Sequence, residues 1–158
     1  FLENEIMYGR GFEEEIPDDH VVPIGKSRIV KPGKDITITA FSITVGYALE
    51  AAAMLAADGI DAEVIDLRSL RPLDTETILE SVRRTNRLVS VEEGWPYAGI
   101  GSEIMAVLME HGFDDLDAPP VRVTAEDVPL PYAANLEKLA LPNAQKIYQA
   151  SKKACYRS

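Results

Sequence analysis

The loop EEGWPYAGIGS, which begins at Glu92, comes nearest to a binding motif in this chain. It follows a predicted buried strand, and open α/β sheets bind ligands at the carboxyl ends of their parallel strands. Gly99 and Gly101, placed before a helix, could let backbone N–H groups approach a phosphate. However, the third glycine of the dinucleotide fingerprint is absent, and Glu92 and Glu93 would repel a pyrophosphate. The pattern therefore favours tight-turn glycines, with Trp95 at a subunit contact, over a phosphate site.

A second candidate is the pair Arg68 and Arg71, which follows another predicted strand end in the segment DLRSLRPLD. Two guanidinium groups could hold a carboxylate or a phosphate. The favoured interpretation is structural: the arginines pair with Asp66 and Asp74 and brace the loop before a helix.

The histidines and the cysteine offer little chemistry. His20 lies in a predicted linker, and His111 lies in the last turn of a predicted helix, where a cation is favourable. Neither has a nucleophile or a ligand set beside it in sequence, so neither is a strong catalytic candidate. The single Cys155 has no second thiol for a disulfide or a metal site, which fits a reducing compartment.

Three carboxylates, Asp114, Asp115 and Asp117, precede a proline-bounded strand. Taken alone, the residues favour a solvated acidic loop. The alternative is a docking patch for arginine or lysine on a partner, in which long-range attraction raises the association rate.

The elements that must position these residues alternate between strands and helices. Apolar runs predict strands over residues 26–30, 36–41, 62–67, 88–91 and 121–124, and helical periodicity predicts helices over residues 44–58, 74–84, 102–112 and 143–154. Gly59 is expected to end the first helix in a left-handed conformation, and Asp74 and Ser102 are expected to cap the next two. The Pro32-Gly33 turn predicts a hairpin, with the first strand antiparallel to the second.

This alternation predicts a three-layer α/β/α sandwich with a mostly parallel five-stranded sheet whose first strand is antiparallel. Residues 9–23 are acidic and turn-rich and look like a linker. We therefore expect residues 1–23 to be the end of an upstream domain plus a linker, and residues 24–158 to be one domain.

Composition narrows the choice of partners. The 158 residues are 46% hydrophobic, which suffices for one domain with a core. The net charge of -10 disfavours nucleic acid and anionic membranes as partners, and favours a basic protein. No apolar run approaches the roughly 18 residues that would span a membrane.

Several segments carry a resemblance to a known family: FLENEIMYG, VPIGKSRIV, AEVIDLRSLRPLD, VSVEEGWPYAGIGSEI, LDAPPVRVTAEDVPLPYAANLE and SKKACYRS. Together they resemble the C-terminal domain, of transketolase C-terminal type, of the beta subunit of the pyruvate dehydrogenase decarboxylating component. The likeness runs nearly end to end. The strings EEGWP and DVPLPYA look more like the pyruvate branch than the branched-chain 2-oxoacid branch. The ending is similar to plant or algal forms, which implies the mitochondrial matrix, with the bacterial cytoplasm as the alternative.

The resemblance implies an alpha2-beta2 heterotetramer that uses thiamine diphosphate and Mg2+ to decarboxylate pyruvate and pass the acetyl unit to a lipoyl group. In this family the cofactor-contacting glutamate and a K+ site of the beta subunit belong to the N-terminal domain, which is expected to precede Phe1. We therefore assign no catalytic, cofactor or metal residue to this chain, and we expect no turnover from it alone.

The resemblance also implies partners: the alpha subunit, a second beta subunit, and the small basic subunit-binding domain of dihydrolipoyl acetyltransferase. Within the family an aspartate of the LDAP string contacts that domain, and the matching residue here is Asp117. The carboxyl terminus lies near that contact in relatives. Two alternatives remain: a related enzyme with a branched-chain 2-oxoacid or a transketolase-like sugar as substrate, and a stand-alone nucleotide- or flavin-binding module that uses the Gly99 loop.

Overall fold

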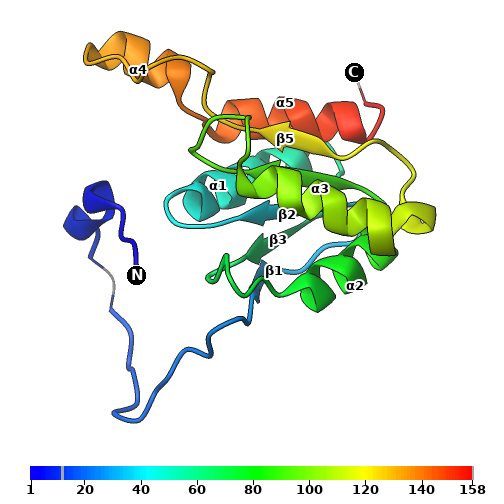
Figure 1. Cartoon of the computed structure of the whole chain (residues 1–158), viewed down its shortest axis with the longest axis horizontal. Coiled ribbons are helices and arrows are strands. Elements are labelled where there is room, and N and C mark those ends of the chain that lie inside the picture. Colours follow the sequence, from blue (N-terminus) through cyan, green and yellow to red (C-terminus); the bar gives the residue numbers. More distant parts are fainter. Residues whose placement is uncertain (12, 158) are drawn as a thin grey trace.

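The computed structural model of the chain describes residues 1–11 and 13–157, which form one mixed sheet with helices on both faces (Figure 1). The strand order is β1-β3-β2-β4-β5. The strands are β1 (Arg28–Lys31), β2 (Ile36–Ala40), β3 (Ala62–Asp66), β4 (Leu88–Val91) and β5 (Val121–Val123). β2, β3, β4 and β5 run parallel to one another and β1 is antiparallel to its neighbour β3, so the predicted fold class is confirmed.

The predicted hairpin is wrong, because β1 pairs with β3 and not with β2. The turn after β1 crosses the amino end of β3: the N–H groups of Lys34 and Asp35 both donate to the carbonyl of Asp61, at 3.0 and 2.9 Å. A Cβ on Gly33 would lie 2.2 Å from the carbonyl carbon of Ala62, so only glycine allows this crossing. The turn therefore places β1 and β2 on opposite sides of β3.

The helices form the two outer layers. α1 (Thr44–Ala57) and α5 (Ala144–Ala154) pack on one face of the sheet, and α2 (Thr75–Thr85) and α3 (Ile100–His111) pack on the other. Ala48, Ala51 and Ala52 are fully buried, and their small side chains let α1 lie close to the sheet and to α5. The short helix α4 (Ala134–Ala140), which the sequence did not predict, projects from the body (Figure 1).

The helix ends agree with the sequence at two of the three predicted positions. Gly59 has a φ of +76°, as a left-handed residue after a helix should, and the Asp74 side chain accepts the N–H of Thr77. Ser102 is not the cap of α3. That helix begins two residues earlier, after Gly99, and the hydroxyl of Ser102 accepts a hydrogen bond from Arg122 instead.

Apart from the 3-10 helix η1 (Glu5–Gly9), the described residues before β1 lack regular structure, and none of the described residues up to position 24 is buried. The remaining element is a second 3-10 turn, η2 (Phe113–Asp115). Within residues 1–11 and 13–157, no helix has both the length and the apolar character needed to cross a membrane.

Candidate functional site at the two ends of the sheet

Glu92 closes the carboxyl end of the sheet, where the parallel strands end. Its side chain is buried at the end of β4, and its two oxygens accept the N–H groups of Ile100 and Gly101, both at 3.0 Å. A carboxylate of the chain itself thus occupies the position at the start of α3 where a phosphate would bind. A Cβ on Gly99 would lie 2.4 Å from the same carboxylate. The two glycines therefore serve a tight internal contact and do not form a phosphate cradle in this structure.

The rest of this loop is more exposed. The amide of Asn4 donates to Glu93 at 3.1 Å, and burial raises the pKa of Glu93, an effect that the Asn4 bond offsets only in part. Trp95 is 58% exposed, and its indole N–H donates to the carbonyl of Val128. The expected subunit contact of Trp95 stays a prediction.

Arg68 braces its loop as expected, while Arg71 does not. The backbone N–H of Arg68 donates to Asp66 at 3.1 Å, and its guanidinium lies 4.0 Å from the same carboxylate. Burial raises the pKa of Asp66, and Arg68 offsets only part of that rise. Among the described residues, Arg71 forms no ion pair within 4.0 Å, so its expected pairing with Asp74 is wrong.

Asp74 is committed to other groups because its side chain faces inward. It accepts the N–H of Ser27, caps α2 through Thr77, and lies 3.8 Å from the ammonium of Lys26. Burial raises the pKa of Asp74, but the hydrogen bonds from Ser27 and Thr77 outweigh it and hold the pKa below its ordinary value. Like Glu92, this carboxylate satisfies a helix start from within the chain.

The histidines lie apart from these groups. His20 is exposed in the segment before β1, and His111, in the last turn of α3, lies 3.7 Å from the carboxylate of Glu110. In residues 1–11 and 13–157, no three His, Cys, Asp or Glu side chains are grouped so that they could hold a metal ion.

The predicted acidic loop lies at the opposite, amino end of the sheet. The side chain of Asp117 is 59% exposed, and its carboxylate lies 3.3 Å from a terminal nitrogen of Arg87. Asp115 lies 3.5 Å from Arg83, in the last turn of α2. Asp114 is exposed and has no ion pair with any described residue. The three carboxylates are therefore a partly neutralised acidic surface that stays accessible.

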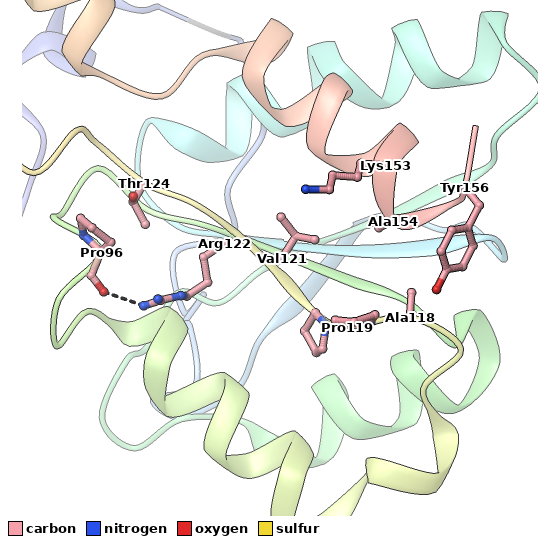
Figure 2. A pocket seen from close by; sticks show the side chains of 10 residues that line it. Pro96, Ala118, Pro119, Val121, Arg122, Thr124, Lys153, Ala154 and Tyr156 are labelled. Atoms are coloured by element: carbon pink, nitrogen blue, oxygen red, sulfur yellow. Dashed lines mark hydrogen bonds between the residues drawn. The ribbon is translucent and has the colours of Figure 1, made fainter. Parts of the chain in front are cut away.

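The end of the chain comes close to Asp117. The hydroxyl of Tyr156 donates to the Asp117 carbonyl at 3.3 Å, whereas Ser158 lies outside the described residues. A cavity of about 710 Å³ adjoins this contact along the outer side of β5. Figure 2 shows Tyr156 and Pro119 toward one end of the cavity and Pro96 toward the other, with Arg122 hydrogen-bonded to the Pro96 carbonyl.

Sequence reasoning missed two residues of these sites. The capping role of Glu92 had a weak signal, an acidic residue at a strand end ahead of a Gly-x-Gly helix start. Arg87 immediately precedes β4, and nothing in the sequence linked it to Asp117, 30 positions away.

Together these observations define a three-layer α/β/α domain with a mixed five-stranded sheet, closed at its carboxyl end and charged at its amino end. The family model for the transketolase C-terminal domain matches residues 25–147. The chain belongs to this family.

Relatives of the chain carry more specific names. It is 55% identical over 157 residues to the pyruvate dehydrogenase E1 component subunit beta of Rhizobium meliloti, covering 99% of this chain and 34% of that protein. It is 56% identical over 161 residues to the mitochondrial pyruvate dehydrogenase E1 component subunit beta-1 of Arabidopsis thaliana, covering all of this chain and 44% of that protein. The chain thus spans less than half the length of these two curated relatives.

A solved structure agrees with this family. A split-gene transketolase, described as an inactive beta4 tetramer, superposes with a TM-score of 0.77 and is 39% identical, over 92% of this chain and 46% of that one. A 2-oxoglutarate:ferredoxin oxidoreductase from Magnetococcus marinus, 15% identical with a TM-score of 0.54, shares the fold.

Proposed function

We propose that the chain is the C-terminal part of the beta subunit of pyruvate dehydrogenase, the component that decarboxylates pyruvate and acetylates lipoyl groups. The observation that carries this proposal is the identity of about 55% to proteins of that name over the length of the chain. In this assignment, residues 1–23 end an upstream domain and lead into the domain that follows. Relatives with mitochondrial and with bacterial origins both occur, so the matrix and the bacterial cytoplasm are both candidate locations.

The whole enzyme would use thiamine diphosphate with Mg2+, and the cofactor supplies the carbanion chemistry of decarboxylation. The residues described here do not fit such a site, because Glu92 already occupies the helix start that could bind a diphosphate. We therefore place the contacts to thiamine diphosphate, to Mg2+ and to a possible K+ in the upstream domain, and we assign this chain an assembly role.

Exposed apolar residues support that role. Trp95 and Tyr97 in the β4–α3 loop are 58% and 86% exposed, and Tyr132, Leu136 and Leu139 on and before α4 are exposed as well. Clustered apolar side chains on a surface commonly mark protein interfaces. We assign this part of the molecule to contacts with the alpha subunit or a second beta subunit.

Docking to the acetyltransferase is assigned to the amino end of the sheet. Asp117 is exposed, lies beside the end of the chain, and has only one cationic partner among the described residues, Arg87. A basic domain could therefore donate charge-assisted hydrogen bonds to the carboxylate oxygen that Arg87 does not contact. The net charge of -10 would add long-range attraction that speeds the encounter.

The experiment compares Asp117→Lys and Asp117→Asn in the complete beta subunit, assembled with its alpha subunit, by calorimetric titration with the basic subunit-binding domain. If the docking contact becomes buried, the affinity should fall by about 2–5 kcal/mol for the reversal and by less for Asn. Asp127→Lys makes the same charge change at an exposed site after β5, toward the carboxyl end of the sheet, and is the matched control. Equal affinity for Asp117→Lys and Asp127→Lys would remove Asp117 from the docking site.

A branched-chain 2-oxoacid enzyme remains the alternative on the same fold, and turnover of the assembled enzyme with pyruvate against branched-chain substrates separates the two. The stand-alone nucleotide module is disfavoured, because the N–H groups it would need are bonded to Glu92. That alternative would be supported if the chain bound a nucleotide or flavin tightly and Glu92→Gln changed the affinity.

A further inference from the structure

A second cavity, of about 330 Å³, opens at the amino end of the sheet, and cationic groups dominate its lining. Lys34 comes from the turn between β1 and β2, Arg87 from the position just before β4, and Arg157 from the segment after α5. Gly59, Ile60 and Cys155 complete the wall, with Asp35 as the carboxylate of the lining. Segments far apart in sequence thus bring three cations to one concave site.

The charges of this cavity are incompletely balanced. In the described part of the chain, no carboxylate oxygen lies within 4.0 Å of the charged nitrogens of Lys34 or Arg157. The Asp35 carboxylate already accepts the N–H of Asp61 at 2.7 Å. Arg87 pairs with Asp117, which lies outside the lining, so among the described residues Lys34 and Arg157 are the cations of the lining without an ion pair, beside one engaged carboxylate. In a protein of net charge -10 this is a local exception, and it favours an anionic ligand.

Arg87 supplies a second, independent observation. One terminal nitrogen lies 3.3 Å from Asp117 and the other 3.5 Å from the carbonyl of Asp35, which holds the guanidinium in place. Its Nε–H is buried and has no acceptor among the described residues. Buried polar groups nearly always have a hydrogen-bond partner, which a water or an anion oxygen can supply.

The thiol of Cys155 does not oppose an anion. Burial raises its pKa, and Asp35 adds to the rise while Arg87 and Arg157 reduce it. The group is therefore a neutral thiol near pH 7, able to donate a weak hydrogen bond.

We propose that this cavity binds a small oxyanion with two or more negative charges, held by Lys34, Arg87 and Arg157. A tetrahedral phosphoryl group fits the chemistry, since guanidinium forks bind phosphate oxygens in a bidentate manner and an ammonium adds a point charge. The volume lies at the lower end of small-ligand sites, so it suits inorganic phosphate or a short phosphate monoester.

The test measures dissociation constants by 31P NMR titration of the complete beta subunit in its native assembly, in a buffer free of other multivalent anions. Inorganic phosphate and glycerol 3-phosphate are titrated separately, and the tighter ligand shows whether the ion or an ester is preferred. We expect saturable binding that weakens with added NaCl, and a loss of about tenfold for Lys34→Gln and for Arg157→Gln. Lys138→Gln, at an exposed position on α4, removes the same charge elsewhere and should change the affinity by less than about twofold.

Circular dichroism and the rescue variant Arg157→Lys separate a local effect from misfolding, since Lys should restore part of the affinity. The proposal is overturned if neither ligand saturates below about 10 mM, a concentration that corresponds to only about 2.7 kcal/mol of binding free energy. It is equally overturned if Lys34→Gln and Arg157→Gln bind like Lys138→Gln.

Discussion

The carboxyl end and the amino end of this sheet handle charge in opposite ways. At the carboxyl end, Glu92 and Asp74 turn inward and satisfy the first turns of α3 and α2. At the amino end, Asp117 points outward beside Arg87, and Lys34 and Arg157 line an open cavity. The carboxylates at the carboxyl end are therefore hydrogen-bonded within the chain, whereas the charged groups at the amino end remain accessible to a partner or ligand.

This difference reverses the usual rule for open α/β sheets, in which ligands bind at the carboxyl ends of the strands. That rule depends on helix starts with free N–H groups, and here the carboxylates of the chain occupy two of those starts. These two carboxylates thus contribute stability at the carboxyl end, and the binding of charged partners that we propose falls at the amino end instead. Three experiments, in order of decreasing expected effect, test whether the two ends differ in this way.

The largest effect is expected at the carboxyl end, from Glu92→Ala. The substitution leaves the N–H groups of Ile100 and Gly101 without their acceptor and opens a hole beside Gly99. Loss of charge-assisted hydrogen bonds and of the cap should lower the free energy of unfolding by about 3 kcal/mol. Chemical denaturation of the assembled subunit measures this, with the exposed Glu110→Ala as the control.

The contrast requires that the same variant leave the amino end intact. Glu92→Ala should bind the basic docking domain and phosphate as the wild type does, under conditions where it is folded. If Glu92→Ala unfolds no more easily than Glu110→Ala, the carboxyl end is not closed by this carboxylate and the comparison fails.

The elements of this fold could be predicted from the sequence, because apolar periodicity and local capping act over a few residues. Asp74 and Gly59 were assigned correctly for that reason, and β4 was placed to the residue. The pairing of the strands is not determined by local sequence. The turn at Gly33 has the residues of a hairpin turn, yet it crosses β3.

The sites were harder to predict for the same physical reason. Ser102 had the chemistry of a cap, but Glu92 reaches the same helix start through the tertiary fold and brings a full charge. The cationic cavity joins residues from position 34 to position 157, and no sequence spacing encodes that meeting. The short helix α4, seven residues long and preceded by a proline-containing segment, gave little periodicity to detect.

A smaller and more diagnostic effect is expected from Arg87→Gln, because Arg87 touches both proposed functions of the amino end. Removing its charge should weaken phosphate binding about tenfold, and should speed association of the basic docking domain a few-fold at low salt because the field near Asp117 becomes more negative. The free energy of unfolding should fall by about 1–2 kcal/mol, less than for Glu92→Ala, because the Arg87 side chain is only 25% exposed and loses its contacts to Asp117 and to the Asp35 carbonyl.

The matched control is Arg83→Gln, which removes the same charge from the partner of Asp115 but does not line the cavity. It should speed docking to a similar extent and leave the phosphate affinity unchanged. If docking becomes slower in Arg87→Gln but not in Arg83→Gln, Arg87 instead orients the Asp117 carboxylate. If the two variants bind phosphate with equal affinity, Arg87 does not contribute to phosphate binding in the cavity.

The smallest effect concerns the thiol in that cavity. Because burial raises the pKa of Cys155 above its ordinary value, the reactive thiolate appears only at higher pH in the folded chain than in the unfolded one. Alkylation by iodoacetamide, followed for the Cys155 peptide by mass spectrometry, should therefore give a rate profile displaced to higher pH relative to a urea-unfolded control. Bound phosphate should slow alkylation of the folded chain a few-fold, because a nearby anion disfavours the thiolate and also blocks the approach of iodoacetamide. In Lys34→Gln, whose phosphate affinity should be about tenfold lower, the same protection should require about tenfold more phosphate. Protection at the wild-type phosphate concentration in this variant would show that phosphate acts elsewhere, and that the amino end is not the anion-binding surface inferred from its cations.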